Sequence, residues 1–161
     1  MERTETNTML NKLSNFLSAT FLPENVEVRE ENTLQLAIAV LLIEVMQADA
    51  ECTFEEQAVI LKILKERFQL SDTEVTQLTE RGQQASQAAN DFYRFTSLIN
   101  HELGLPGKIQ IVEYLWQVVY ADGKVSAHEN HIMRKLVDLL HVSLGDNAAA
   151  KARARAAIGL K

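Results

Sequence analysis

The sequence contains few residues that interrupt helices and almost none that cross-link them. Its 161 residues include 2 prolines, 6 glycines and 1 cysteine, whereas 47% of the residues are hydrophobic. Strands need turn residues between them and helices tolerate few breakers, so this composition favours long helices over a sheet. Two domains of half this length would each bury a poorer core, and we therefore expect one all-α domain covering residues 1–161.

The chain also lacks the features of a nucleic-acid-binding, secreted or membrane protein. A net charge of −6 opposes binding to phosphate backbones, so we expect no nucleic-acid partner. The single cysteine, Cys52, cannot form an internal disulfide, and residues 1–5 lack the basic-then-apolar order of a signal peptide. The most apolar stretch, residues 34–46, is shorter than the roughly 20 residues that span a bilayer. We expect a cytoplasmic protein with no transmembrane segment.

Apolar residues at helical spacing predict a bundle of about seven to eight helices. A first amphipathic helix is expected over residues 4–20, packed as a lid. Residues 30–48 and 106–120 are apolar on nearly every side of a helix, so both segments should be central. Later helices are expected to be capped by Asn90 and to follow Asp146, and the polar run 83–89 should be the weakest helical segment.

Three pairs with the spacing Ser/Thr-x-x-Glu predict helix starts. In such a pair the hydroxyl and the carboxylate each accept a hydrogen bond from the other residue's backbone N–H, which satisfies two free amides at the start of a helix. The three pairs are Thr53 with Glu56, Ser71 with Glu74, and Ser126 with Glu129.

The two halves of the chain are related by a shift of 73 residues without a gap. The shift aligns Ile38 with Ile111 and Leu42 with Leu115 in the two apolar segments, and it continues through the turns that follow them. Each unit, about 30–70 and 106–142, is thus a buried helix, an acidic turn and an amphipathic helix. We expect the units to be related by a pseudo-twofold axis.

Each unit places an Asp at the end of its central helix and a Glu seven residues later, in the first turn of the next helix. The four residues are Asp49 and Glu56 in the first turn and Asp122 and Glu129 in the second. A purely structural reading is that the Glu caps a helix and the Asp forms a turn. The alternative is that the turns converge and bind a divalent cation, which would relieve the repulsion between the carboxylates. An EF-hand is excluded, because its Asp-rich twelve-residue loop is absent.

The two turns resemble the paired signatures of the tellurite-resistance TerB family. The segments are Ala48-Asp49-Ala50-Glu51-Cys52-Thr53-Phe54-Glu55-Glu56 and Ala121-Asp122-Gly123-Lys124-Val125-Ser126-Ala127-His128-Glu129, and the similarity covers roughly residues 30–145. The resemblance implies an all-helical protein of bacterial stress and metal resistance, in which acidic residues of these turns bind divalent metal ions.

Some neighbouring side chains extend or complicate this hypothesis. Glu55 and His128 occupy aligned positions and are secondary candidates for the metal site, whereas His131 is interpreted as a surface residue. Oxygen ligands alone favour Ca, Mg or Mn, and His128 would add affinity for Zn or Ni. Cys52 aligns with Val125, and we interpret both as apolar plugs beneath the turns.

The candidate functions follow from these residues. No Gly-rich phosphate loop, two-cysteine metal motif or recognisable acid and base pair is present, so an enzyme is disfavoured and no catalytic residue is assigned. The leading hypothesis is a non-enzymatic metal-binding stress protein whose other partners are proteins. The alternative is a helical interaction module or scaffold whose acidic turns are only structural. A metal-dependent hydrolase would need a substrate cleft that the sequence does not indicate.

Overall fold

The computed structural model describes residues 23–160 of the chain. The chain divides into two compact units, Met1–Thr33 and Leu34–Lys161. Of the first unit, only residues 23–33 are described, and they form the beginning of helix α2. The helix expected over residues 4–20 lies outside the described residues. Helix α2 begins at Pro23, seven residues before the start at residue 30 that the sequence predicted.

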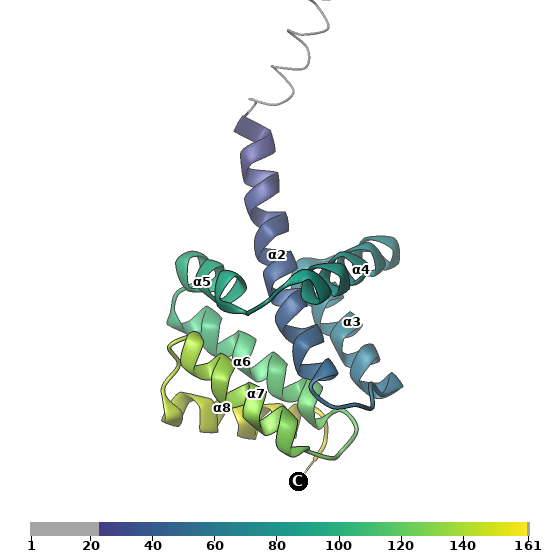
Figure 1. The fold of residues 1–161 in the computed structure, drawn as a ribbon, viewed down its shortest axis with the longest axis vertical. Helices are drawn as coiled ribbons and strands as arrows, with labels where there is room; N and C mark the ends of the chain where they lie inside the picture. Colours follow the sequence, from purple (N-terminus) through teal and green to yellow (C-terminus); the bar gives the residue numbers. More distant parts are fainter. Residues whose placement is uncertain (1–22, 161) are drawn as a thin grey trace, which may run out of the picture. The chain divides into compact units, whose positions relative to one another are not determined.

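The described residues form seven helices and no strand, which confirms the all-α prediction (Figure 1). No helix in this part of the chain is both long enough and apolar enough to cross a membrane. The helices are α2 (Pro23–Gln47), α3 (Phe54–Phe68), α4 (Asp72–Ala88), α5 (Tyr93–Glu102), α6 (Leu105–Tyr120), α7 (Ala127–Leu139) and α8 (Leu144–Ala157).

Side-chain caps set most of the helix starts. The three predicted boxes, at the starts of α3, α4 and α7, are all formed. Two other predicted starts are wrong by two to three residues. Helix α5 begins after Phe92, with the carboxylate of Asp91 accepting a hydrogen bond from the backbone N–H of Tyr93 at 3.0 Å. Helix α8 is capped by Ser143, whose hydroxyl accepts from the N–H of Asp146 at 3.1 Å.

The two segments predicted to be central are buried. In α2 every residue from Ala37 to Ile43 is at most 1% exposed. In α6 the side chains of Ile111, Val112 and Leu115 are fully buried. Burial on all sides explains why these two helices lack the polar face that the others carry. The pseudo-twofold relation between the units remains a prediction.

The second half of α4 packs against α2. Helix α4 continues to Ala88 through most of the polar run 83–89, and that this run is the weakest helical segment stays a prediction. At Gly82 the helices are so close that a Cβ would lie 2.9 Å from Ile43 Cδ1 and 3.3 Å from Ala39 Cβ. One turn later, buried Ser86 donates a hydrogen bond to the carboxylate of Glu44. The small residues that weaken the intrinsic helix propensity are therefore the ones that allow this contact.

Helix α8 packs against α6 through polar and aromatic contacts. The indole N–H of Trp116 donates to Asn147 Oδ1 at 2.8 Å. The ammonium of Lys151 lies 4.6 Å from the centre of the Trp116 ring. Arg153 Nε lies 2.8 Å from Glu113 Oε2. The cations of α8 thus stabilise its packing on α6.

Candidate metal centre

The first acidic turn, residues 49–56, joins α2 to α3. Asp49 is half-buried just beyond the end of α2. Thr53 caps α3 in extended backbone geometry, and its hydroxyl accepts a hydrogen bond from the N–H of Glu56 at 3.2 Å. The N–H of Thr53 in turn donates to Glu56 Oε2 at 3.0 Å. The hydrogen bond to Oε2 therefore orients the Glu56 carboxylate, and the other oxygen takes no part in the cap.

The second acidic turn, residues 122–129, joins α6 to α7 in the same way. The N–H of Ser126 donates to Glu129 Oε1 at 3.0 Å, and the N–H of Glu129 donates to Ser126 Oγ at 3.0 Å. Asp122 Oδ1 accepts from the N–H of Lys124 at 2.9 Å. Gly123, between them, has a φ of 79°, which a residue with a side chain adopts only at a cost.

The capping glutamates of both turns are buried, and each has an oxygen without a partner. Glu56 is 0% exposed and Glu129 is 1% exposed. Oε1 of Glu56 and Oε2 of Glu129 are buried with no hydrogen bond among the described residues. A buried carboxylate oxygen that accepts no hydrogen bond is unfavourable. These two oxygens are thus the atoms of the capping glutamates that accept no hydrogen bond from a described residue.

The third capping box shows that capping does not require this burial. Glu74 makes the same two hydrogen bonds with Ser71 at the start of α4, but its side chain is exposed. Those hydrogen bonds hold the pKa of Glu74 below its ordinary value. Helix capping explains Glu74 completely, and it does not explain why Glu56 and Glu129 are buried.

The charges of the two turns act on each other. Burial raises the pKa of Glu56, and the charges of Glu129 and Asp122 raise it further against the hydrogen bond from Thr53. Burial also raises the pKa of Glu129, with added contributions from Asp122 and Asp49. The negative charge of each turn therefore contributes to the raised pKa of the buried glutamate in the other turn. Figure 1 shows the α2–α3 and α6–α7 connections side by side at one end of the helices.

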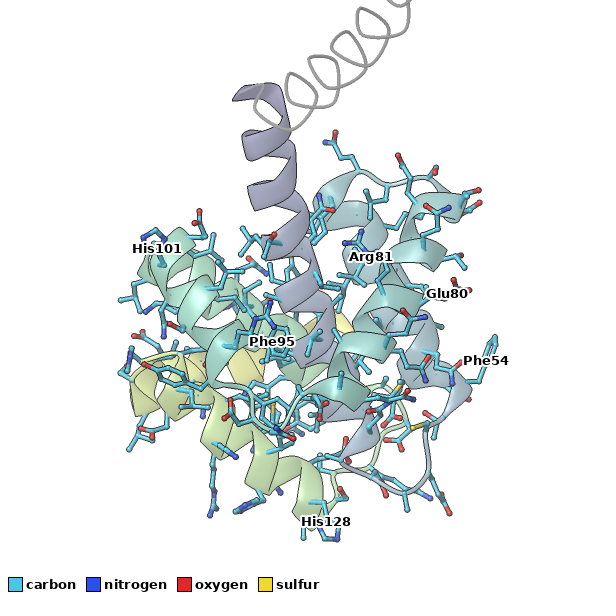
Figure 2. All side chains as sticks on the ribbon, turned by 45° about the horizontal axis from the view of Figure 1, so that its top comes forward. Phe54, Glu80, Arg81, Phe95, His101 and His128 are labelled. Atoms are coloured by element: carbon cyan, nitrogen blue, oxygen red, sulfur yellow. The ribbon has the colours of Figure 1, made fainter. Side chains whose placement is uncertain are left out.

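The four carboxylates do not form a ready metal cage. In the part of the chain that the structure describes, no three His, Cys, Asp or Glu side chains are grouped so as to hold a metal ion. The secondary candidates Glu55 and His128 are exposed, in the first turns of α3 and α7 respectively (Figure 2 labels His128). His131 is exposed on α7, as predicted. Neither Glu55 nor His128 contributes to the raised pKa of the buried glutamates.

The interpretation of Cys52 as an apolar plug is wrong. Cys52 is exposed, and Val125 at the aligned position is 37% exposed. Both residues immediately precede a capping residue with extended backbone, in the connection between two helices. Partial burial of the thiol, together with the charges of Glu56 and Asp49, raises the pKa of Cys52. A raised pKa leaves less thiolate, which is the opposite of an activated nucleophile.

The molecule is thus an all-α protein in which two acidic turns each bury a capping glutamate. The family model described as tellurite resistance protein TerB matches residues 35–152, which include both turns and most of the chain. The chain belongs to the TerB family. No curated protein and no solved structure gives a match.

Proposed function

We propose that this protein is a non-enzymatic protein of tellurite-resistance type that binds a divalent cation between its acidic turns. Asp49, Glu56, Asp122 and Glu129 would hold the ion. One observation carries the proposal. Glu56 and Glu129 are buried, each has one oxygen that accepts no hydrogen bond from a described residue, and charges of the opposite turn contribute to the raised pKa of each. Family membership supports the tellurite-resistance class.

A divalent cation fits the chemistry of these side chains. Burial and the charges of nearby carboxylates raise the pKa of both glutamates, so positive charge would stabilise their ionised forms most directly, and no described cation forms an ion pair with either. All four candidate ligands supply oxygen, which Ca²⁺, Mg²⁺ and Mn²⁺ prefer. Recruitment of His128 would shift the preference toward Zn²⁺ or Ni²⁺.

Binding would require a local change in the two aspartates. Because no three candidate side chains already surround one point, the ion must draw Asp49 and Asp122 toward the buried glutamates. Both aspartates are half-buried at the ends of helices rather than within them, so a change of rotamer leaves the core intact. Once bound, the cation would offset part of the negative charge of the turns and connect α3 to α7.

The proposal is tested by calorimetric titration of the metal-free protein with Ca²⁺, Mg²⁺, Mn²⁺, Zn²⁺ and Ni²⁺. The double variant Glu56→Gln and Glu129→Gln keeps an oxygen for each cap but removes both buried charges, so binding should weaken at least tenfold. Glu74→Gln is the matched control, because it alters an identical cap that is exposed, and it should bind like the parent. Equal binding by the parent and the double variant, or none by the parent, contradicts the proposal. In that case the turns are caps of an interaction module.

A further inference from the structure

Cys52 lies between the end of α2 and the buried glutamate of the first acidic turn. Its thiol donates a long hydrogen bond, 3.8 Å, to the carbonyl oxygen of Met46 in the last turn of α2. The next residue, Thr53, donates its backbone N–H to Glu56 Oε2 at 3.0 Å. The turn thus folds back on the end of α2 and brings the one thiol of the chain next to the capping carboxylate.

The groups near this thiol are negatively charged or are hydrogen-bond acceptors. Partial burial and the charges of Glu56 and Asp49 raise the pKa of Cys52, so both carboxylates lie near the sulfur. Glu56 is 0% exposed, and its Oε1 has no hydrogen bond among the described residues. The last carbonyl groups of α2 add the partial negative charge of a helix C-terminus. These surroundings favour a cation beside the sulfur.

The present contact of the sulfur is weak. A thiol is a poor hydrogen-bond donor, so the bond to the Met46 carbonyl is easily exchanged for another. Cys52 is exposed, and rotation about a single side-chain bond moves its sulfur without disturbing the core. In the second turn the corresponding residue is Val125, which immediately precedes Ser126. The thiol is therefore a feature of the first turn alone.

We propose that Cys52 is a thiolate ligand of the cation site, and that the site therefore takes Zn²⁺ in preference to Ca²⁺, Mg²⁺ or Mn²⁺. This inference rests on the proposed site between the acidic turns and names the ion for it. Zn²⁺ accepts sulfur and carboxylate oxygen in one site, whereas Ca²⁺ and Mg²⁺ take oxygen. As the bond from sulfur to the ion forms, the thiol releases its proton to solvent, and the charge of the ion offsets that of the nearby carboxylates.

Cobalt absorption tests for a bond between the sulfur and the ion. Co²⁺ substitutes for Zn²⁺, and a thiolate ligand gives it a sulfur-to-cobalt charge-transfer band in the near ultraviolet. The parent, kept reduced with TCEP, should show this band, and Cys52→Ser should not. The control adds Gln84→Cys to Cys52→Ser, which places one exposed thiol on α4, and it should show no band. A parent that binds Co²⁺ without the band, or a control with the same band, overturns the proposal.

Competition between Zn²⁺ and Mn²⁺ tests the selectivity. Most protein sites bind Zn²⁺ more tightly than Mn²⁺, so the diagnostic quantity is the change in the ratio of the two dissociation constants between parent and variant. Cys52→Ser removes the sulfur and leaves every carboxylate, so the preference for Zn²⁺ should fall by about tenfold or more. An unchanged ratio overturns the assignment of Cys52 as a ligand.

Alkylation tests the same bond in the unmodified chain. Iodoacetamide reacts with free thiolate, so Zn²⁺ bound to Cys52 should slow its alkylation by about tenfold or more, and Mg²⁺ should slow it much less. In the Cys52→Ser, Gln84→Cys control neither ion should protect the thiol. Equal protection by Zn²⁺ and Mg²⁺, or protection of the control thiol, contradicts a specific bond to Cys52.

A thiol in the second turn separates failure of this inference from failure of the shared site. Val125 is 37% exposed and precedes Ser126, whose N–H donates to Glu129 Oε1 at 3.0 Å, as the N–H of Thr53 does to Glu56. Val125→Cys in the Cys52→Ser background should therefore restore the cobalt band if the ion lies between the turns.

The outcomes are distinct. A band in the parent but not in the Val125→Cys variant supports Cys52 as a ligand and contradicts an ion shared by both turns. Binding of Ca²⁺ or Mn²⁺ by a parent that gives no cobalt band supports the proposed function and overturns the present inference. A parent that binds no divalent ion overturns both.

Discussion

Replacing one buried glutamate by glutamine should stabilise the metal-free protein. In Glu56→Gln the side-chain oxygen can still accept the hydrogen bond from Thr53, which is 3.0 Å long in the parent. The substitution removes a charge that burial and Glu129 both disfavour. The glutamine NH₂ that takes the place of the unpartnered oxygen is also a buried polar group, so only the loss of the charge contributes, and we expect the free energy of unfolding to rise by about 1–2 kcal/mol. For a domain of this size that corresponds to about 2–8 °C in melting temperature.

The assay is urea unfolding followed by circular dichroism at pH 7 in EDTA, with Glu74→Gln measured in parallel. The exposed cap gains nothing from loss of charge, because its hydrogen bonds favour the ionised form. We therefore expect Glu74→Gln to lower stability by up to about 1 kcal/mol. If Glu56→Gln is destabilised by the same amount as Glu74→Gln, the buried charge is not a source of strain and the reasoning is refuted.

Three further predictions concern pH, packing and the cysteine. The raised pKa values of Glu56 and Glu129 mean that the folded state binds protons more tightly than the unfolded state. The free energy of unfolding in EDTA should therefore increase as the pH falls from 7.5 toward about 4.5, which is the ordinary pKa of glutamate. Urea midpoints should show this increase, and the double glutamine variant should lose it. Gly82→Val should cost about 1–3 kcal/mol by crowding α2, whereas Gly145→Ala, with nothing within 4 Å of its added Cβ, should change stability by less than about 0.5 kcal/mol in the same assay. Cys52→Ser should leave the melting temperature within about 2 °C of the parent, because the thiol is exposed; a larger loss would mean that the side chain packs in the core.

The fold was largely predictable because its determinants are local. The three capping boxes, at Thr53, Ser71 and Ser126, start helices at the predicted residues. Burial on all sides was correctly predicted from the absence of a polar face in α2 and α6. The close approach of Gly82 to Ala39 and Ile43 of α2 was not predictable in this way, because it is a tertiary contact that local helix propensity does not indicate.

The candidate site was predictable in its residues but not in its environment. The capping pattern is the same for Glu56, Glu74 and Glu129, and nothing in that pattern distinguishes the buried boxes from the exposed one. The distinguishing signal lies upstream. The buried boxes follow α2 and α6, whose apolar residues are largely buried, whereas Glu74 follows the amphipathic α3. The exposure of Cys52 was missed because an aligned apolar residue, Val125, was interpreted as evidence of burial.

The most direct test of the central claim is the melting temperature of the protein with and without divalent ions. An ion that binds only the folded state stabilises it by roughly 1.4 kcal/mol at ten times its dissociation constant, which corresponds to about 3–6 °C here. The double variant Asp49→Asn and Asp122→Asn removes two charges but keeps the side-chain shape, so it should remain folded and lose the metal-dependent shift. If the parent shows no shift with Ca²⁺, Mg²⁺, Mn²⁺, Zn²⁺ or Ni²⁺, or if the double variant shifts as much as the parent, the acidic turns do not form a metal site.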